Sequence, residues 1–188
     1  SNVKVQYNVF TKTSQDGVVR GPGSGEVQNI SICYNYSNSF SSYRFGHFAC
    51  TINGLEMIGN DLTCVSTYDF LNVQGKIKGK VVINNNKYIN SMQSFLYVSG
   101  VGAMDCEIKG NYIEGTACTA IDFRAMKEDG DVKFVIENNE LNNTGTDWGT
   151  IRIRSAEYGD GDSLSIIVKD NKIIESHCVM DDGTPRFI

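Results

Sequence analysis

The chain has 188 residues, 40% of them hydrophobic, and its formal net charge at pH 7 is −5. A chain of this length can bury a sizeable core in one domain, and its acidic balance disfavours nucleic acid or an anionic membrane surface as the main partner. No apolar run approaches the length of a membrane-spanning helix, so membrane insertion is not expected.

An internal repeat runs through the chain and is marked by seven asparagines: Asn8, Asn35, Asn60, Asn86, Asn111, Asn139 and Asn171. Their spacings are 27, 25, 26, 25, 28 and 32 residues. The residues five before them are all apolar: Val3, Ile30, Leu55, Val81, Cys106, Phe134 and Ile166. Those three before are also apolar: Val5, Ile32, Met57, Ile83, Ile108, Ile136 and Val168. Apolar residues two apart predict a strand with one buried face ahead of each asparagine.

A sharp bend and a second strand are predicted at and after each asparagine. The preceding residues are Tyr7, Tyr34, Gly59, Asn85, Gly110, Asn138 and Asp170, and five of these seven are types that tolerate a left-handed backbone. The residues two after the asparagines are apolar except Ser37: Phe10, Ser37, Leu62, Tyr88, Ile113, Leu141 and Ile173. Each repeat therefore continues through a tight bend into another half-buried strand.

A third strand is predicted about ten residues later in each repeat, at 17–20, 43–46, 69–73, 94–98, 120–124, 150–154 and 177–179. Three short strands in about 25 residues describe one coil of a parallel β-helix. Coils stacked at the strand spacing of roughly 4.8 Å would bring equivalent asparagines together. Each buried amide could then bond the amides above and below it. We predict an all-β, single-stranded parallel β-helix of about seven coils with an asparagine ladder.

This repeat resembles the right-handed parallel β-helix superfamily, the pectate-lyase-like fold of polysaccharide lyases, many glycoside hydrolases and phage tailspikes. The resemblance covers nearly the whole chain. It implies a right-handed coil, a polysaccharide partner and a secreted or cell-surface location. The resemblance does not identify a function, because enzymes, adhesins and inert spikes share this fold.

Residues 1–188 are expected to form a single domain. Val3, Val5 and Asn8 already match the repeat, so no cap is expected ahead of the first coil in this sequence. Open coil edges are normally covered in natural proteins. We therefore expect that the domain is excised from a longer polypeptide or that an oligomer buries this end.

The cysteines and histidines suggest no metal centre. The six cysteines show no CxxC spacing, and the histidines His47 and His177 are isolated, which argues against zinc. Cys106 occupies an apolar position of the repeat, so most thiols are expected to be free and buried. An even number of cysteines would also permit disulfides in a secreted protein. Both histidines are interpreted as ordinary core or surface residues.

The repeat lengthens only in the loops after two consecutive third strands, at 125–131 and 155–162. Next to these loops, the outward strand positions are expected to hold Asp122, Arg124, Arg152 and Arg154, with Asp122 beside Arg152 and Arg124 beside Arg154. Earlier coils add Asn72, Gln74, Tyr97 and Ser99 to the same polar stripe. Enzymes of the superfamily place their substrate groove on such a stripe.

The resemblance makes Asp122, Arg124, Arg152 and Arg154 candidate catalytic residues. Arginine can bind the acidic group of a uronate or a sulfated sugar through two hydrogen bonds. The candidate substrate ligands are Asn72, Tyr97, Trp148 and Tyr158, with the aromatic rings suited to stacking on sugars. Asp160 and Asp162 could bind calcium through oxygen atoms, although their segment lacks the calcium-binding nonapeptide repeat. No other cofactor is expected.

Two functions remain open. In the first, the domain binds and, as a lyase or glycoside hydrolase, cleaves an acidic polysaccharide along the stripe. In the second, it is a non-catalytic stalk, adhesin or tailspike-like receptor-binding module, and the charges on the stripe are ordinary cross-strand pairs. The lengthened loops favour the first function. The minimal loops elsewhere and the missing cap favour the second.

Overall fold

The computed structural model describes residues 2–11, 18–41, 43–64, 67–124, 130–144, 149–154 and 163–174, with two short strands at 178–179 and 185–186. Every regular element in these ranges is a β-strand. Accordingly, the described residues include no helix long and apolar enough to cross a membrane. The predicted all-β class is confirmed.

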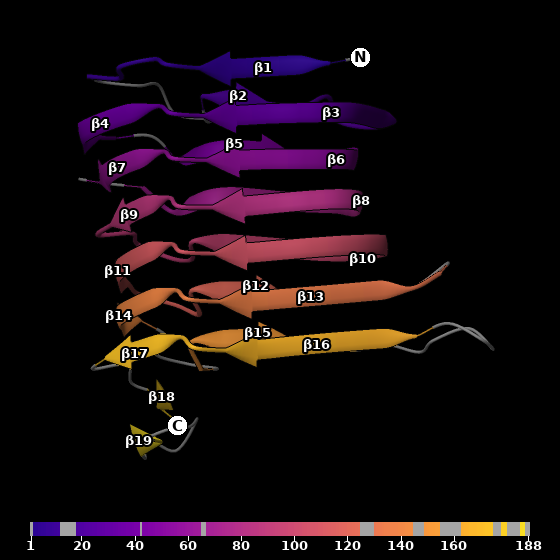
Figure 1. Cartoon of the computed structure of the whole chain (residues 1–188). Helices are drawn as coiled ribbons and strands as arrows, with labels where there is room; N and C mark the ends of the chain where they lie inside the picture. Colours follow the sequence, from indigo (N-terminus) through magenta and orange to yellow (C-terminus); the bar gives the residue numbers. More distant parts are fainter. Residues whose placement is uncertain are drawn as a thin grey trace.

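The strands stack into a coil with three sides (Figure 1). The strands that precede the asparagines are the longest: β1 (Val3–Gln6), β3 (Glu26–Cys33), β6 (Thr51–Ile58), β8 (Asp69–Asn84), β10 (Leu96–Lys109), β13 (Val132–Glu137) and β16 (Leu164–Lys169). The strands that follow them form the second side: β4 (Tyr36–Phe40), β7 (Asp61–Cys64), β9 (Lys87–Ile89), β11 (Tyr112–Thr116), β14 (Glu140–Thr144) and β17 (Lys172–Ile174).

The third side consists of β2 (Val19–Arg20), β5 (Arg44–Phe48), the first parts of β8 and β10, β12 (Ile121–Phe123) and β15 (Ile151–Ile153). Because β8 and β10 continue from the third side into the long side, these two sides belong to one 11-stranded sheet. We call the third side the third-strand face. It lies behind the long strands in Figure 1.

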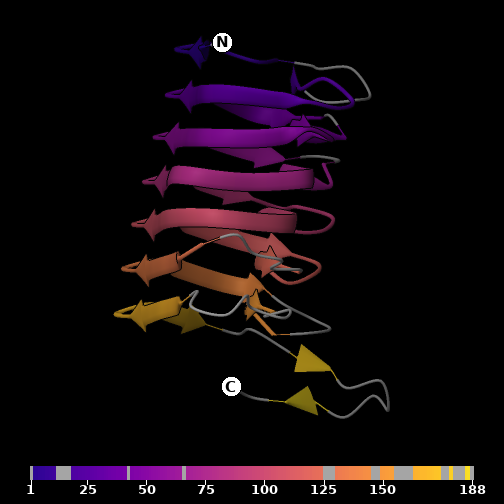
Figure 2. The ribbon, with the colours of Figure 1, turned by 90° about the vertical axis from the view of Figure 1, so that its right-hand side faces the viewer.

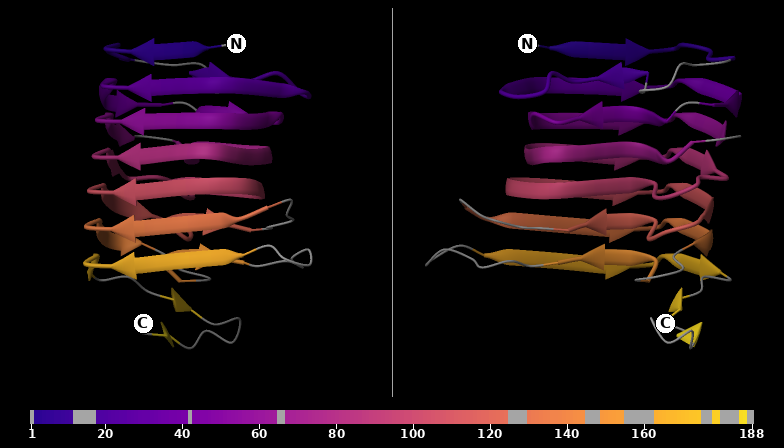
Figure 3. Two further views of the ribbon diagram at one scale, coloured as in Figure 1. Left: turned by 45° about the vertical axis from the view of Figure 1, so that its right-hand side comes forward. Right: turned by 180° about the vertical axis from the view of Figure 1, so that it is seen from behind.

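All strand pairs between coils are parallel, as predicted. Seen from the amino-terminal end, the chain turns clockwise as it moves along the stack, so the coil is right-handed (Figure 1). Figure 2 and Figure 3 show the same stack from other sides, with the coils in sequence order from one end to the other.

The structure has about five complete coils, and the predicted count of about seven was wrong. In the first coil the second strand is reduced to one bridge, between Val9 and Tyr36. In the last coil the expected third strand is β18 (Cys178–Val179), which pairs antiparallel with β19 (Pro185–Arg186). An antiparallel strand pair thus takes the place of the seventh rung of the third-strand face.

The repeat positions predicted to face inward form the core. In the central coils they are nearly all fully buried, as with Ile32, Met57, Ile83 and Ile108. In the last coil, Ile166, Val168 and Ile173 remain 43–50% exposed. Ser37, the exception to the apolar pattern, is buried as well.

The bend before each asparagine is left-handed in all seven repeats. The values of φ lie between 54° and 64° at Tyr7, Tyr34, Gly59, Asn85, Gly110, Asn138 and Asp170. The prediction therefore holds even for the two tyrosines, which rarely adopt this conformation. Their rings stack with a centroid distance of 5.1 Å.

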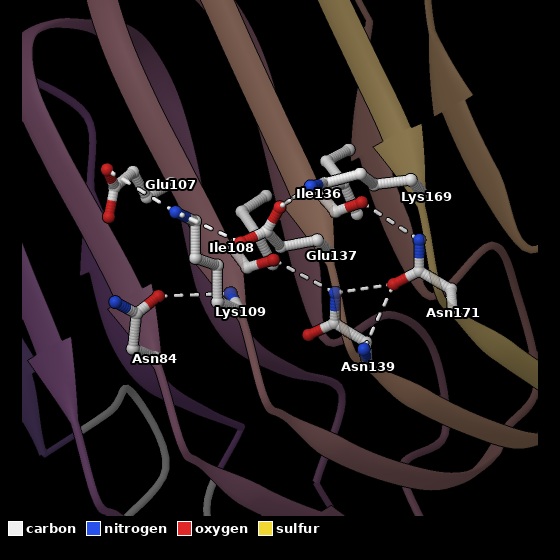
Figure 4. Close-up of polar contacts among 9 residues, drawn as sticks. All are labelled: Asn84, Glu107, Ile108, Lys109, Ile136, Glu137, Asn139, Lys169 and Asn171. Atoms are coloured by element: carbon white, nitrogen blue, oxygen red, sulfur yellow. Dashed lines mark hydrogen bonds and ion pairs between the residues drawn. The ribbon is translucent and has the colours of Figure 1, made fainter.

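The asparagine ladder is continuous from Asn8 to Asn171. In each step, the backbone N–H and the side-chain Nδ2 of one asparagine donate to Oδ1 of the next, at 2.8–3.1 Å. Nδ2 also donates to a carbonyl oxygen of the preceding coil, as Asn139 does to Ile108 and Asn171 to Ile136 (Figure 4). An interior asparagine therefore has all of its amide groups bonded, although it is only 1% exposed.

Five cysteines, all except Cys178, are described with their side chains, and all five are free thiols. Cys33, Cys50, Cys64 and Cys106 are buried and Cys118 is half-buried. The expectation of buried free thiols is confirmed for these four.

Candidate functional site

One column of residues runs along the outer side of the third-strand face. Strand register aligns Arg20 with His47, His47 with Asn72, Asn72 with Tyr97, Tyr97 with Asp122, and Asp122 with Arg152. The predicted neighbours Asp122 and Arg152 are thus confirmed. Arg154 follows in the same register, because its N–H donates to the carbonyl oxygen of Phe123. His47, interpreted as an ordinary residue from the sequence, belongs to this column.

Asp122 is held by two arginines. Nε of Arg152 donates to Oδ1 at 2.8 Å, and Nη2 of Arg152 bonds Oδ2. Nε of Arg124 donates to Oδ2 at 2.7 Å. Asp122 is 0% and Arg152 only 9% exposed. The two residues occupy outward strand positions as predicted, but they are buried and form an ion pair.

Arg124 is the accessible member of this cluster. Its side chain is 41% exposed, and its guanidinium carbon lies 4.5 Å from the ring centroid of the half-buried Tyr97. Burial opposes its charge, but the hydrogen bond and the negative charge of Asp122 outweigh this and raise the pKa of Arg124. Asp122 and Tyr97 therefore hold a permanent positive charge at the surface, with the exposed Arg154 on the next coil.

A second buried carboxylate, Asp69, was missed in the sequence. It begins the third-strand segment of its coil and is 0% exposed. Its Oδ2 accepts from Nδ2 of Asn72 at 2.8 Å and lies 3.5 Å from Nε of Arg44. Its Oδ1 accepts from the N–H of Ser94. The repeat spacing pairs Arg44 with Asp69 in register. This pair of opposite charges at equivalent positions could have identified Asp69 from the sequence.

Asp69 should make stability depend on pH. Burial, opposed by its hydrogen bonds and by Arg44, raises its pKa above the ordinary value. The folded protein thus keeps this proton to higher pH than the unfolded chain. Stability from this group is present below the unfolded pKa of about 3.9 and is lost as pH rises through the window up to the folded pKa. Relative to wild type, Asp69→Asn should therefore gain stability as pH rises from about 4 to 7.

Urea unfolding of both proteins at each pH measures this change. Asp131→Asn is the matched control with the opposite sign. Hydrogen bonds from Ser163 lower the pKa of Asp131. The stability of the wild type relative to Asp131→Asn should therefore increase as pH rises. A stability difference between Asp69→Asn and wild type that stays constant with pH would contradict the assignment of a raised pKa.

The arrangement favours binding over proton transfer. A general acid or base must come within hydrogen-bond reach of its substrate, yet Asp69 and Asp122 are both 0% exposed. Among the described residues around Asp122, the groups that a ligand can reach are the guanidinium of Arg124, part of Tyr97 and the exposed Arg154. A similar arginine–tyrosine contact lies farther along the face, where the guanidinium carbon of Arg44 is 4.3 Å from the ring centroid of Tyr43, but the Arg44 side chain is only 13% exposed.

Several predicted site residues lie outside the described residues: Trp148, Tyr158, Asp160 and Asp162. The calcium prediction therefore stays a prediction. Within the described ranges, no group of three or more His, Cys, Asp or Glu side chains is placed to hold a metal ion.

No protein-family model, curated protein or solved structure matches the chain. The likeness to the pectate-lyase-like superfamily therefore rests on the repeat and the coil alone, and the function has to be argued from the geometry of the site.

Proposed function

We propose that the domain binds an acidic polysaccharide on its third-strand face and does not cleave it. The observation that supports this most directly is Arg124, an exposed guanidinium fixed between a buried carboxylate and an aromatic ring. A fixed arginine loses little side-chain entropy on binding and can offer two parallel hydrogen bonds to a carboxylate or sulfate.

Arg154 extends the site along the coil axis. It follows Arg124 on the next coil, roughly one strand spacing of 4.8 Å away along the stack. Two positive groups in a row suit a polymer with repeated acidic groups better than a single small anion. Tyr97 adds a partly accessible ring beside them, which is the kind of surface on which a sugar ring packs.

The non-catalytic part of the proposal rests on burial. Cleavage by a hydrolase needs two carboxylates that flank the bond, and a lyase needs an accessible base. The buried carboxylates Asp69 and Asp122 are instead engaged by Asn72, Ser94 and arginines. A polysaccharide ligand also fits the expected secreted or cell-surface location.

Isothermal titration with polygalacturonate and with a neutral glucan tests the proposal. We expect binding of the acidic polymer only, weakened by salt and reduced at least about tenfold in Arg124→Ala/Arg154→Ala, since each arginine would supply charge-assisted hydrogen bonds. The double change Lys87→Ala/Lys172→Ala is the matched control, because it removes two exposed positive charges from the second side of the coil. It should bind normally.

Equal binding of the neutral glucan, or full binding by the arginine variant, would contradict the site. Assays for new reducing ends and for unsaturated products should show no turnover. Depolymerisation that disappears in Asp69→Asn would contradict the non-catalytic part and favour an enzyme. If no glycan of either class binds, the stalk function becomes the better explanation.

A further inference from the structure

A cavity of about 400 Å³ lies on the long side of the coil, away from the third-strand face. It spans the first four coils, with lining residues from β1, β3, β6 and β8. Its volume falls within the range of roughly 300–1,000 Å³ typical of small-molecule sites. The polymer site proposed above does not use any of its residues.

Two left-handed backbone positions, one of them a glycine without a side chain, form part of the cavity lining. β3 and β6 each contain a left-handed residue, Asn29 with φ of 53° and Gly54 with φ of 85°, and both line the cavity. Strand register places them side by side, between the pairs Gln28–Asn53 and Ile30–Leu55. Gly54 leaves space above Asn29, because a Cβ atom there would lie only 3.1 Å from Oδ1 of Asn29.

Three polar side chains are already connected across the cavity. Nε2 of Gln6 donates to Oγ of Ser31 at 2.9 Å, and Oγ of Ser31 donates to Oε2 of Glu56 at 3.1 Å. Ser31 is only 8% exposed, so the centre of this chain is fixed. Fixed donors and acceptors of this kind can bind hydroxyl groups with little further loss of side-chain conformational entropy.

Two lysines in the cavity wall form no ion pair with a described carboxylate. Many surface lysines pair with carboxylates one or two coils away: Lys78, Lys87, Lys109, Lys169 and Lys172. Figure 4 shows two of these, Lys109 and Lys169, which share Glu137. By contrast, Lys4 and Lys80 have no carboxylate partner in the part of the chain that the structure describes. The cavity therefore offers positive charge next to hydroxyl-binding groups.

We propose that this cavity binds a small hydroxylated anion, of the size of a single sugar acid. Lys4 and Lys80 would pair with its acidic group, and Gln6, Ser31 and Glu56 would bond its hydroxyl groups. The site is separate from the arginines of the third-strand face. It therefore stands or falls independently of the proposed polymer binding.

Titration of the isotope-labelled protein with glucuronate, followed by NMR chemical-shift changes, tests the proposal. Glucose supplies hydroxyl groups without the charge, and inorganic sulfate supplies charge without the ring. We expect saturable binding of glucuronate at the amides around Ser31 and Glu56, and at least about tenfold weaker binding of each fragment, because each lacks one half of the contacts.

Lys80→Gln and Lys4→Gln should each weaken glucuronate binding by about tenfold. Lys133→Gln is the matched control, because Lys133 is an exposed lysine of the same side that does not line the cavity. Arg124→Ala/Arg154→Ala should bind glucuronate as the wild type does. Chemical shifts distant from the cavity confirm that each variant is folded.

Absence of saturable shifts at the cavity, or equal weakening by Lys133→Gln, would overturn the proposal. Shifts that move to Arg124 and vanish in the arginine variant would also overturn it, because they would assign glucuronate to the polymer site. Binding of glucose as tight as that of glucuronate would remove the role of the lysines.

Discussion

Asn86→Ala should lower the free energy of unfolding by about 3–5 kcal/mol, since unmet buried polar groups cost roughly 1–3 kcal/mol each. The change removes both the donor and the acceptor of the side chain. The backbone N–H and Nδ2 of Asn60 lose their common acceptor, and the carbonyl oxygen of Met57 loses its donor. Asn60 and Asn86 are each 1% exposed, so water cannot easily replace these bonds.

Urea unfolding followed by circular dichroism measures the loss. Asn8→Ala is the matched control, because Asn8 is exposed and only one neighbouring asparagine bonds it. Its cost should stay below about 1 kcal/mol. Asn86→Asp should fall between the two: it keeps acceptors for Asn60 but cannot donate to Met57 or Asn111. Equal costs for Asn8→Ala and Asn86→Ala would show that the ladder does not stabilise the coil.

Asp122→Ala should cost about 3–5 kcal/mol, the usual loss when one partner of a buried ion pair is removed. Of the two arginines that lose this carboxylate, Arg152 is the buried one, at 9% exposed, and it binds Asp122 through two nitrogen atoms. The expected loss is therefore mainly the penalty for a buried charge that loses its carboxylate. It does not measure the net contribution of the pair.

The matched comparisons separate these two quantities. Replacing both buried partners together, Asp122→Leu with Arg152→Met, should cost far less than Asp122→Ala, because the buried positive charge is removed with the carboxylate and Arg124, which also loses Asp122, is 41% exposed. Arg124→Ala should cost no more than about 1 kcal/mol, since solvent screens its partly exposed pair. Thermal and urea unfolding provide the values. A double variant less stable than Asp122→Ala would contradict a structural role based on charge compensation.

The fold could be predicted because the same pattern of apolar residues recurs in every coil. Apolar residues five and three before each asparagine alternate with outward residues, and this pattern fixes the strand faces in every coil. The coil count failed because the prediction relied on local pattern alone. Cys178 and Val179 fit the expected third strand, but they pair antiparallel with a strand nearby in sequence, Pro185–Arg186.

For the candidate site, the sequence predicted which residues align between coils but not how exposed their side chains are. The spacing of the repeat placed Asp122 beside Arg152 correctly. The accessibility of an outward residue depends on where long neighbouring side chains lie, and Arg124 and Arg152 both converge on this carboxylate. Asp69 was missed because it lies at the start of its strand. There the alternation of inward apolar and outward polar residues does not tell which residues are buried.

The asparagine ladder also has a direction. In the bonds between asparagines, each residue from Asn8 to Asn139 donates to the next one toward the carboxy terminus, and each from Asn35 to Asn171 accepts from the one before it. The two ends of the stack are therefore chemically opposite, like the two ends of a polar filament. Asn8 presents an acceptor and Asn171 presents donors. Any further coil, whatever its source, must match that polarity, and two identical ends cannot satisfy each other across the ladder.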